Sequence, residues 1–152
     1  MSTLLLDAST ILAAFDSDDD LYEPARAILV GSDVTLATLD LARYEVANVV
    51  LRAWRAPDRV NALLEAIDRI SNDSGVLLST TGLLTRAAQL AEEHAISVYD
   101  AAYVAAASQA GATLVSCDTR DLVSKGLATS PEDVQPDAPP SGDPQDTSTD
   151  PE

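Results

Sequence analysis

The sequence predicts an α/β fold, a three-layer α/β/α arrangement in which helices flank a central parallel sheet. Short apolar segments alternate with longer helical patterns along the chain. These segments are apolar throughout instead of alternating with polar residues, which is typical of strands buried on both faces. Polar residues, several of them acids, follow the ends of the segments. We expect strands at residues 4–6, 34–37, 76–78 and 114–116.

The predicted helices begin and end at residues suited to those places. Pro24 falls in the first turn of one helix, where its missing amide costs nothing. Asp40 opens a long helix, and Pro57 starts the next, whose apolar residues recur on one face. Gly111 follows the last helix as its C-cap. The helices are expected at residues 9–15, 21–30, 40–54, 58–70, 83–94 and 97–110.

The composition divides the chain into two parts. A length of 152 residues fits one domain. Residues 131–152 hold six of the eight prolines, seven of the 25 acids and no Lys or Arg. Such a segment buries too little apolar surface to offset the entropy of ordering. We predict a folded domain over residues 1–130 and an acidic, Pro-rich disordered tail over residues 131–152, which acts as a solubilising appendage or an electrostatic shield of the site.

The net charge of −16 bears on the choice of partner. Residues 1–130 still carry 18 acids against 9 bases, so the body is acidic as well. A polyanion normally binds to a basic face. Either the acids of the body have a task of their own, or the substrate is not a polyanion.

The same composition indicates a cytoplasmic setting without a membrane partner. No run of 18 apolar residues is present, so no membrane-spanning helix is expected. The first residues lack the basic segment of a signal peptide. Cys117 is the only cysteine, which excludes an intrachain disulfide and favours a reducing compartment.

Two acids directly follow predicted strands. Asp7 ends the first strand, and Asp118 comes after the last. Ligands of parallel sheets bind beyond the carboxyl ends of the strands, so both carboxylates are expected at one rim. Each could instead cap the helix that follows it, because a first turn favours a carboxylate. Asp121 lies three residues after Asp118, and both cannot cap the same helix end.

Glu45 lies within the long helix that Asp40 opens. It is four residues after Leu41 and four before Val49, so we expect it on their inward face. An acid on an apolar stripe is costly unless it is paired or bound to a metal. The alternatives are a boundary position or an ion pair with a neighbouring arginine.

Asp100 lies in the first turn of the last predicted helix. The preceding Ser97 makes a capping box plausible, in which Asp100 would only bond back to the backbone. The helix that follows is rich in alanine, and small residues let a helix approach its neighbours closely. A close approach would bring Asp100 near the rim that carries Asp7.

Converging carboxylates repel one another, which a hard divalent cation relieves. Two unit charges about 4 Å apart cost on the order of 4 kcal/mol at an effective dielectric near 20. A ligand set made only of carboxylates suits Mg²⁺ or Mn²⁺ better than Zn²⁺. Such a metal lowers the pKa of a bound water and stabilises the charge of a phosphodiester transition state. The acids would therefore recruit cations, and the cations would recruit phosphate.

Four segments carry a resemblance to a known family. In order and spacing the chain resembles PIN-domain proteins, and more narrowly VapC-type toxin ribonucleases, over about residues 3–128. The matching segments are Leu5-Leu6-Asp7-Ala8-Ser9, Tyr44-Glu45-Val46, Ser97-Val98-Tyr99-Asp100-Ala101-Ala102-Tyr103 and Leu114-Val115-Ser116-Cys117-Asp118-Thr119-Arg120-Asp121-Leu122.

This resemblance implies a Mg²⁺-dependent site, with Mn²⁺ as an alternative ion, in a PIN-like α/β/α fold. The implied catalytic residues form an acidic quartet of Asp7, Glu45, Asp100 and Asp118. Within the quartet, Asp7, Asp100 and Asp118 are the expected metal ligands. The implied supporting residues are Ser9, Ser116 and Asp121.

The resemblance also implies a function and partners. It implies endonucleolytic cleavage of RNA, homodimerisation, and inhibition by a small VapB-type antitoxin protein in a toxin–antitoxin system. An acidic body and an acidic tail depart from the pattern expected of an RNA-binding protein.

Three other interpretations compete with a nuclease. A phosphatase with Asp7 as nucleophile would want a second Asp two residues later, where Ser9 stands. A phospho-acceptor receiver would want a late Lys at a strand end, whereas Lys125 follows the last helical turn. A non-catalytic PIN-like interaction module would keep the fold and only bind a partner, and metal binding separates it from the nuclease.

Overall fold

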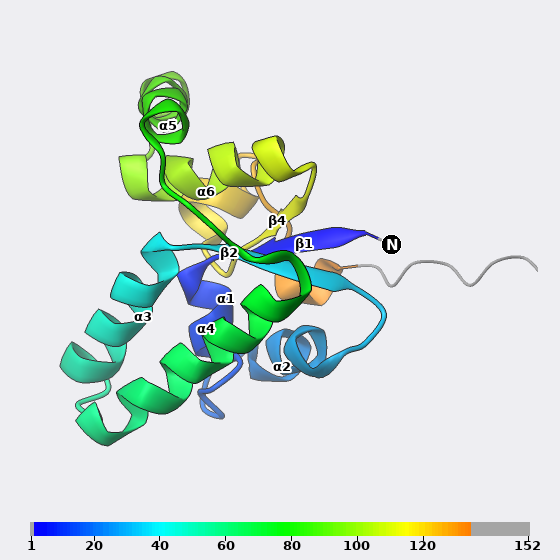
Figure 1. Cartoon of the computed structure of the whole chain (residues 1–152), viewed down its shortest axis with the longest axis vertical. Coiled ribbons are helices and arrows are strands. Elements are labelled where there is room, and N and C mark those ends of the chain that lie inside the picture. Colours follow the sequence, from blue (N-terminus) through cyan, green and yellow to red (C-terminus); the bar gives the residue numbers. More distant parts are fainter. Residues whose placement is uncertain (1, 135–152) are drawn as a thin grey trace, which may run out of the picture.

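The computed structural model describes residues 2–134 and confirms the predicted α/β fold with a central parallel sheet. The sheet has the strand order β3-β2-β1-β4, and every pairing is parallel. Figure 1 shows α5 and α6 on one side of the sheet and α1 to α4 on the other. Within residues 2–134, no helix is long and apolar enough to cross a membrane. The strands are β1 (Thr3–Leu6), β2 (Thr35–Leu39), β3 (Val76–Leu77) and β4 (Thr113–Val115).

The helices lie close to their predicted positions. Gly111 adopts a left-handed conformation (φ 63°) after α6, as expected of a C-cap. Helix α5 begins two residues before its predicted start, because the Thr80 hydroxyl caps it by accepting the Leu83 amide. Three short helical turns, η1 (Pro57–Arg59), η2 (Thr119–Val123) and η3 (Pro131–Asp133), join or follow the longer elements. The α-helices are α1 (Ala8–Ala13), α2 (Tyr22–Val30), α3 (Leu41–Arg52), α4 (Val60–Ser74), α5 (Thr81–His94) and α6 (Val98–Ala110).

Strand β2 continues two residues beyond its predicted end. Thr38 is fully buried, although a polar residue there had suggested the end of the strand. Its hydroxyl donates to the Leu6 carbonyl of β1 at 2.7 Å, so the buried oxygen has a partner. Asp40 precedes α3 as expected, but its carboxylate accepts the Ser79 amide at 3.0 Å instead of capping that helix.

Helix α6 lies against the middle of the sheet and contacts β1, β2 and β4. Its alanines make this possible, since Ala101, Ala102 and Ala106 are at most 1% exposed. Helix α5 packs on α6 in turn. The prediction that small residues bring this helix close to the sheet is therefore confirmed.

The folded body extends past the predicted boundary at residue 130. Turn η3 packs on α2, and Pro131 is buried there. Residues 131–134 thus belong to the body and not to a disordered tail, because their apolar side chains have a surface to cover. The rest of the predicted tail, residues 135–152, lies outside the described residues.

Candidate active site

The carboxyl ends of β1 and β4 place Asp7 and Asp118 at one rim of the sheet. The two strands are neighbours, with Leu6 opposite Val115. The Asp7 amide continues this pairing by donating to the Val115 carbonyl at 3.2 Å. Both acids follow the paired ends within a few residues, so the predicted shared rim is confirmed.

Asp7 is buried, with 4% of its surface exposed, and its carboxylate accepts three hydrogen bonds. Oδ1 accepts the Ser9 hydroxyl at 2.7 Å and the Thr10 amide at 3.0 Å. Oδ2 accepts the Ser116 hydroxyl at 2.5 Å. Asp7 therefore caps α1, as the alternative interpretation had it, and at the same time faces the rim.

Ser9 and Ser116 connect Asp7 to the loop after β4. The Ser9 hydroxyl, which donates to Asp7, accepts the Cys117 amide at 2.9 Å. The Ser116 hydroxyl also donates to Asp7 and accepts the Asp118 amide at 3.0 Å. Each oxygen of Asp7 is thus linked through one hydroxyl to one amide of the loop. The two serines that the resemblance marked as supporting residues hold this loop to the end of β1.

Glu45 lies beside the buried stripe of α3 and not in it. The buried residues of α3 are Ala42, Val46 and Val50, whereas Leu41 and Val49, expected to mark the inward face, are half-buried. The expected face was therefore off by one position. Glu45 is half-buried, and its Oε1 accepts the Tyr103 hydroxyl of α6 at 2.7 Å.

The predicted alternative for Glu45, an ion pair with Arg43 or Arg52, is wrong, because Glu45 forms no ion pair within the described part of the chain. Arg43 instead pairs with Asp68 of α4, at 2.5 Å between Nη2 and Oδ1. The Glu45 carboxylate therefore has no ion-pair partner among the described residues, and its charge adds to that of the acidic rim.

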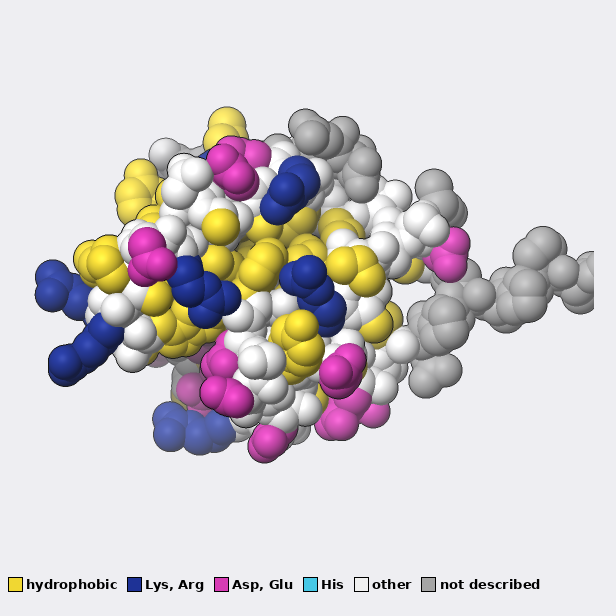
Figure 2. All heavy atoms as spheres, turned by 90° about the horizontal axis from the view of Figure 1, so that it is seen from below, with side chains coloured by type: hydrophobic (Ala, Val, Ile, Leu, Met, Phe, Trp, Pro, Cys, Tyr) yellow, Lys and Arg dark blue, Asp and Glu magenta, His cyan; other side chains and the backbone are white. Residues whose placement is uncertain are grey.

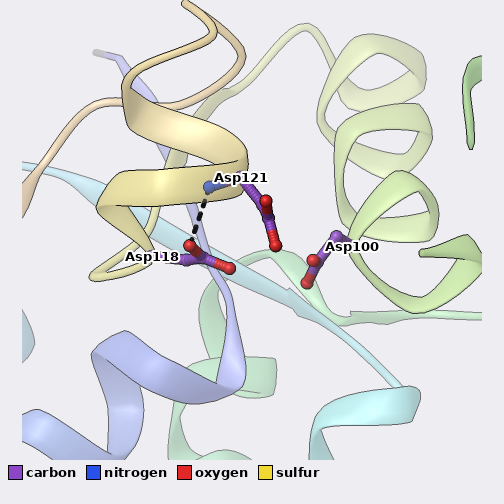
Figure 3. Close-up of side chains that lie close together, drawn as sticks. All are labelled: Asp100, Asp118 and Asp121. Carbon is purple, nitrogen blue, oxygen red and sulfur yellow. Dashed lines mark hydrogen bonds between the residues drawn. The ribbon is translucent and has the colours of Figure 1, made fainter. Parts of the chain in front are cut away.

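Asp100, Asp118 and Asp121 form the tightest group of acids among residues 2–134. One carboxylate oxygen from each lies within 4.8 Å of the others. Figure 3 shows Asp100 reaching from the start of α6 toward the two acids of the η2 segment. Asp118 caps η2 by accepting the Asp121 amide at 3.0 Å. Asp121 is therefore not the cap of this turn, and its carboxylate belongs to the acidic group.

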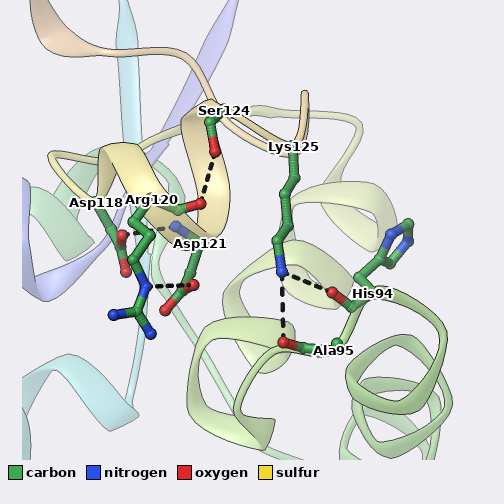
Figure 4. Close-up of polar contacts among 7 residues, drawn as sticks. All are labelled: His94, Ala95, Asp118, Arg120, Asp121, Ser124 and Lys125. Atoms are coloured by element: carbon green, nitrogen blue, oxygen red, sulfur yellow. Dashed lines mark hydrogen bonds and ion pairs between the residues drawn. The ribbon is translucent and has the colours of Figure 1, made fainter.

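Each of these acids has a second local contact. The Asp100 amide donates to the Ser97 hydroxyl at 3.0 Å, which is one half of the predicted capping box. Asp121 Oδ1 accepts Arg120 Nε at 3.2 Å, and the arginine side chain is 90% exposed (Figure 4). An arginine so exposed neutralises little of the charge of the group.

Burial raises the pKa values of three acids, and the charges of neighbouring acids add to it for Glu45 and Asp100. Burial is the largest cause for Asp7, whose hydrogen bonds to both serines and Thr10 act in the opposite direction. Burial also raises the pKa of Glu45, and the charges of Asp7 and Asp100 add to it. For Asp100, burial is followed by the charge of Asp118. All the predicted acids therefore share one electrostatic environment.

The group fits a hard divalent cation. Its donors are carboxylate oxygens within reach of one ion, they come from two elements, and they repel one another without a cation. The group differs in one member from the expected metal ligands Asp7, Asp100 and Asp118. Asp121, expected only as a supporting residue, stands with Asp100 and Asp118, whereas Asp7 lies behind them with three hydrogen bonds.

Two residues of the site were missed in the sequence. Tyr103 lies three residues after Asp100, and only the structure shows that its hydroxyl meets Glu45. Thr10 is buried, and its hydroxyl donates to the Val115 carbonyl at 3.0 Å. Both residues lie in mainly apolar helices. The signal available in the sequence was a polar side-chain atom there without an obvious partner.

Cys117 stands beside the rim without a catalytic character. Burial, followed by the charge of Asp7, raises the pKa of its thiol to about 11. The nucleophile is the thiolate, so this environment disfavours covalent chemistry.

Known proteins match this chain over most of its length. The family model of the PIN domain matches residues 4–125. Ribonuclease VapC3 of Pyrobaculum aerophilum is 36% identical over 126 residues, which cover 80% of this chain and 93% of that protein. The match to the family model includes all the acids described above.

Solved structures share the fold. The Mycobacterium tuberculosis toxin VapC20, titled a sarcin-ricin loop cleaving toxin, superposes with a TM-score of 0.64 at 20% identity, covering 81% of this chain and 95% of that one. A toxin–antitoxin complex from Klebsiella pneumoniae gives a TM-score of 0.61 at 19% identity, with coverages of 84% and 97%. The family match, the relative and the fold agree, and the chain belongs to the PIN-domain family.

Proposed function

We propose that this chain is a Mg²⁺-dependent endoribonuclease and the toxin of a VapBC-type toxin–antitoxin system, with Mn²⁺ as an alternative ion. The observation that carries the proposal is the convergence of Asp7, Glu45, Asp100 and Asp118, with Asp121, at one rim of the sheet of a PIN-domain chain. The name of ribonuclease VapC3, which is 36% identical to this chain, supports the activity.

In this proposal the acids divide into two groups. Asp100, Asp118 and Asp121 hold the ion through outward-facing carboxylates. When bound, a hard divalent ion there lowers the pKa of a water and neutralises the charge that develops on the phosphodiester. Asp7 and Glu45 complete the negative environment, Asp7 from the buried side and Glu45 from α3. Because Ser9 and Ser116 hold Asp7 in place, the site keeps its shape while RNA enters and leaves.

The acidic charge agrees with this function once cations are included. Five of the described acids gather at the rim, where bound cations would provide the positive charge that an RNA phosphate needs. Arg120, exposed beside Asp121, is the described cation that lies nearest to this group in the chain. RNA affinity is then expected to require the divalent ion.

A homodimer is part of the proposal, supported by an exposed apolar face. Four large apolar side chains of α3, α5 and α6 surround a hollow of about 600 Å³. Tyr44 is 77% exposed and Tyr99 is 64% exposed, and a monomer in water gains nothing by exposing them. The four side chains are Tyr44, Leu84, Val98 and Tyr99.

A VapB-type antitoxin is the second proposed partner. Helices α2 and α4 border a hollow of about 380 Å³ that is lined by apolar side chains and by Arg26 and Arg69. Arg26 lies over the Phe15 ring, with its guanidinium carbon 5.3 Å from the ring centre. Figure 2 shows Lys and Arg side chains beside exposed apolar surface on this side of the molecule. An amphipathic antitoxin segment with acidic side chains would suit such a surface.

Metal binding is the first test, because it needs no knowledge of the RNA. The melting temperature is measured with and without Mg²⁺ or Mn²⁺ for wild type and for Asp100→Asn. A ligand that binds only the native state adds about 2.7 kcal/mol at a hundred times its dissociation constant. Stabilisation of the wild type and none of Asp100→Asn is the expected result.

Cleavage is the second test. Total RNA is incubated with wild type or Asp100→Asn, in Mn²⁺ or in excess chelator. We expect new 5′ ends only with wild type and metal. If metal stabilises the wild type but no RNA is cut under any condition, the chain is a metal-binding interaction module. If metal changes nothing, the metal-dependent mechanism is wrong.

A further inference from the structure

Tyr103 places one polar atom at the edge of an otherwise apolar core. The side chain is 2% exposed, and its ring belongs to the main hydrophobic core. A phenylalanine would fill the same space. The hydroxyl donates to Glu45 Oε1 at 2.7 Å, and the bond joins α6 to α3 across 58 residues of sequence.

Glu45 has no other described hydrogen-bond or ion-pair partner. The nearest arginine in sequence, Arg43, is paired with Asp68. Within the part of the chain that the structure describes, Glu45 Oε2 accepts no hydrogen bond. A glutamate side chain has several rotatable bonds, and holding it in one conformation costs entropy.

The neighbouring acids work against the position that Glu45 takes. The charges of Asp7 and Asp100 both act on Glu45 and disfavour its ionised form. A free carboxylate in this place would move toward water, where like charges are screened. The Tyr103 hydroxyl supplies the attraction that opposes this movement.

We propose that Tyr103 is a positioning residue that holds the Glu45 carboxylate at the acidic rim through its hydroxyl. The proposal rests on the proposed function only where it concerns metal binding. Burial and the charge of Glu45 raise the pKa of Tyr103 above its usual range, so the hydroxyl keeps its proton and remains a donor at working pH.

The first experiment measures Mn²⁺ affinity for Tyr103→Phe, Glu45→Ala and the double variant. The phenylalanine keeps the ring and removes only the hydroxyl, which donates to Glu45 and also interacts with the Ala8 backbone. Partners that orient metal-site groups typically contribute 10–100-fold to affinity, and we expect a loss of about tenfold for Tyr103→Phe. In the Glu45→Ala background, Tyr103→Phe should cause no further loss, because its effect passes through Glu45.

Tyr22→Phe is the matched control. Tyr22 begins α2, is half-buried, lines neither proposed interface, and makes no described hydrogen bond through its hydroxyl. Its variant should bind Mn²⁺ as tightly as wild type. An equal loss for Tyr103→Phe with and without Glu45 would show that the hydroxyl supports the fold and would overturn the proposal.

The second experiment separates this proposal from the proposed function. Crystal structures of metal-free wild type and Tyr103→Phe are compared at Glu45. We expect the carboxylate to leave the rim in the variant. If it stays in place, the positioning role is wrong, whatever the metal data show. If the wild type binds no Mn²⁺ yet Glu45 moves in the variant, the positioning role stands and the metal-dependent function fails.

Discussion

The Ser116 hydroxyl donates to Asp7 Oδ2 at 2.5 Å, although the two residues are 109 positions apart in sequence. The same hydroxyl accepts the Asp118 amide. One side chain therefore fixes the distance between the acid at the end of β1 and the acid after β4.

Replacing Ser116 by alanine should weaken metal binding. The change removes one of the hydrogen bonds that oppose the effect of burial on Asp7, so the pKa of Asp7 rises further. It also leaves the Asp118 amide without its acceptor. We expect Mn²⁺ affinity to fall about tenfold, as measured by calorimetry. Ser124→Ala is the control, because the Ser124 hydroxyl bonds only to the Arg120 carbonyl at an exposed position, and it should change nothing.

Asp7→Asn should change how stability depends on pH. The folded-state pKa of Asp7 is raised above its usual value of 3.8, so the native state binds this proton more tightly than the unfolded chain. Without metal, the free energy of unfolding of the wild type should therefore fall as pH rises from about 3.8 to the raised pKa. Urea unfolding at several pH values should show that the free energy of unfolding of the variant rises relative to that of the wild type across this window. A constant difference between them would contradict the prediction.

The contact of α6 with the sheet predicts a cost for larger side chains. Ala106 is fully buried where α6 faces the strands. Ala106→Leu should lower the free energy of unfolding by about 1–3 kcal/mol, because inserting methylenes into a packed core forces the backbone to shift. Ala110→Leu places the same side chain at an exposed position of the same helix, and thermal unfolding should show little change for it.

Turn η3 predicts where the chain can be shortened. A chain that ends after residue 134 keeps Pro131 buried on α2, whereas one that ends after residue 130 exposes that surface. We expect the longer truncation product to melt like the full chain and the shorter one to melt at a lower temperature. Equal melting temperatures would show that η3 contributes nothing to stability. Activity and solubility of the longer product also test the proposed role of residues 135–152.

The strands and the shared rim were predictable from the sequence because local pattern decides them. Apolar runs gave the strands, and the rule that parallel strands end at one rim brought Asp7 and Asp118 together. Residues whose role depends on a distant partner were not predictable in this way. Thr38 extends β2 because Leu6 accepts its hydroxyl, and Asp121 joins Asp100 because η2 turns its side chain toward Asp100.

Glu45 shows the same limit on a helix. Its spacing indicated the right side of α3 but not the exact face, since α4 and α1 together decide which stripe is buried. Tyr103 belongs to the same case. A tyrosine in an alanine-rich helix predicts core packing, and only the position of α3 reveals that its hydroxyl has an acid to bind.

Lys125 connects the segment after η2, the turn that presents Asp118 and Asp121, to the turn before α6, the helix that carries Asp100. Its Nζ donates to the His94 carbonyl at 2.8 Å and to the Ala95 carbonyl at 3.4 Å, so the segment after η2 is fastened to the turn before α6 (Figure 4). Asp121 lies on one side of this fastening and Asp100 on the other. The backbone that presents these acids is therefore assembled before any ion arrives. An ion that binds there loses its own hydration but orders little of the protein, so its association should be limited by the exchange of its water and not by a rearrangement of the chain.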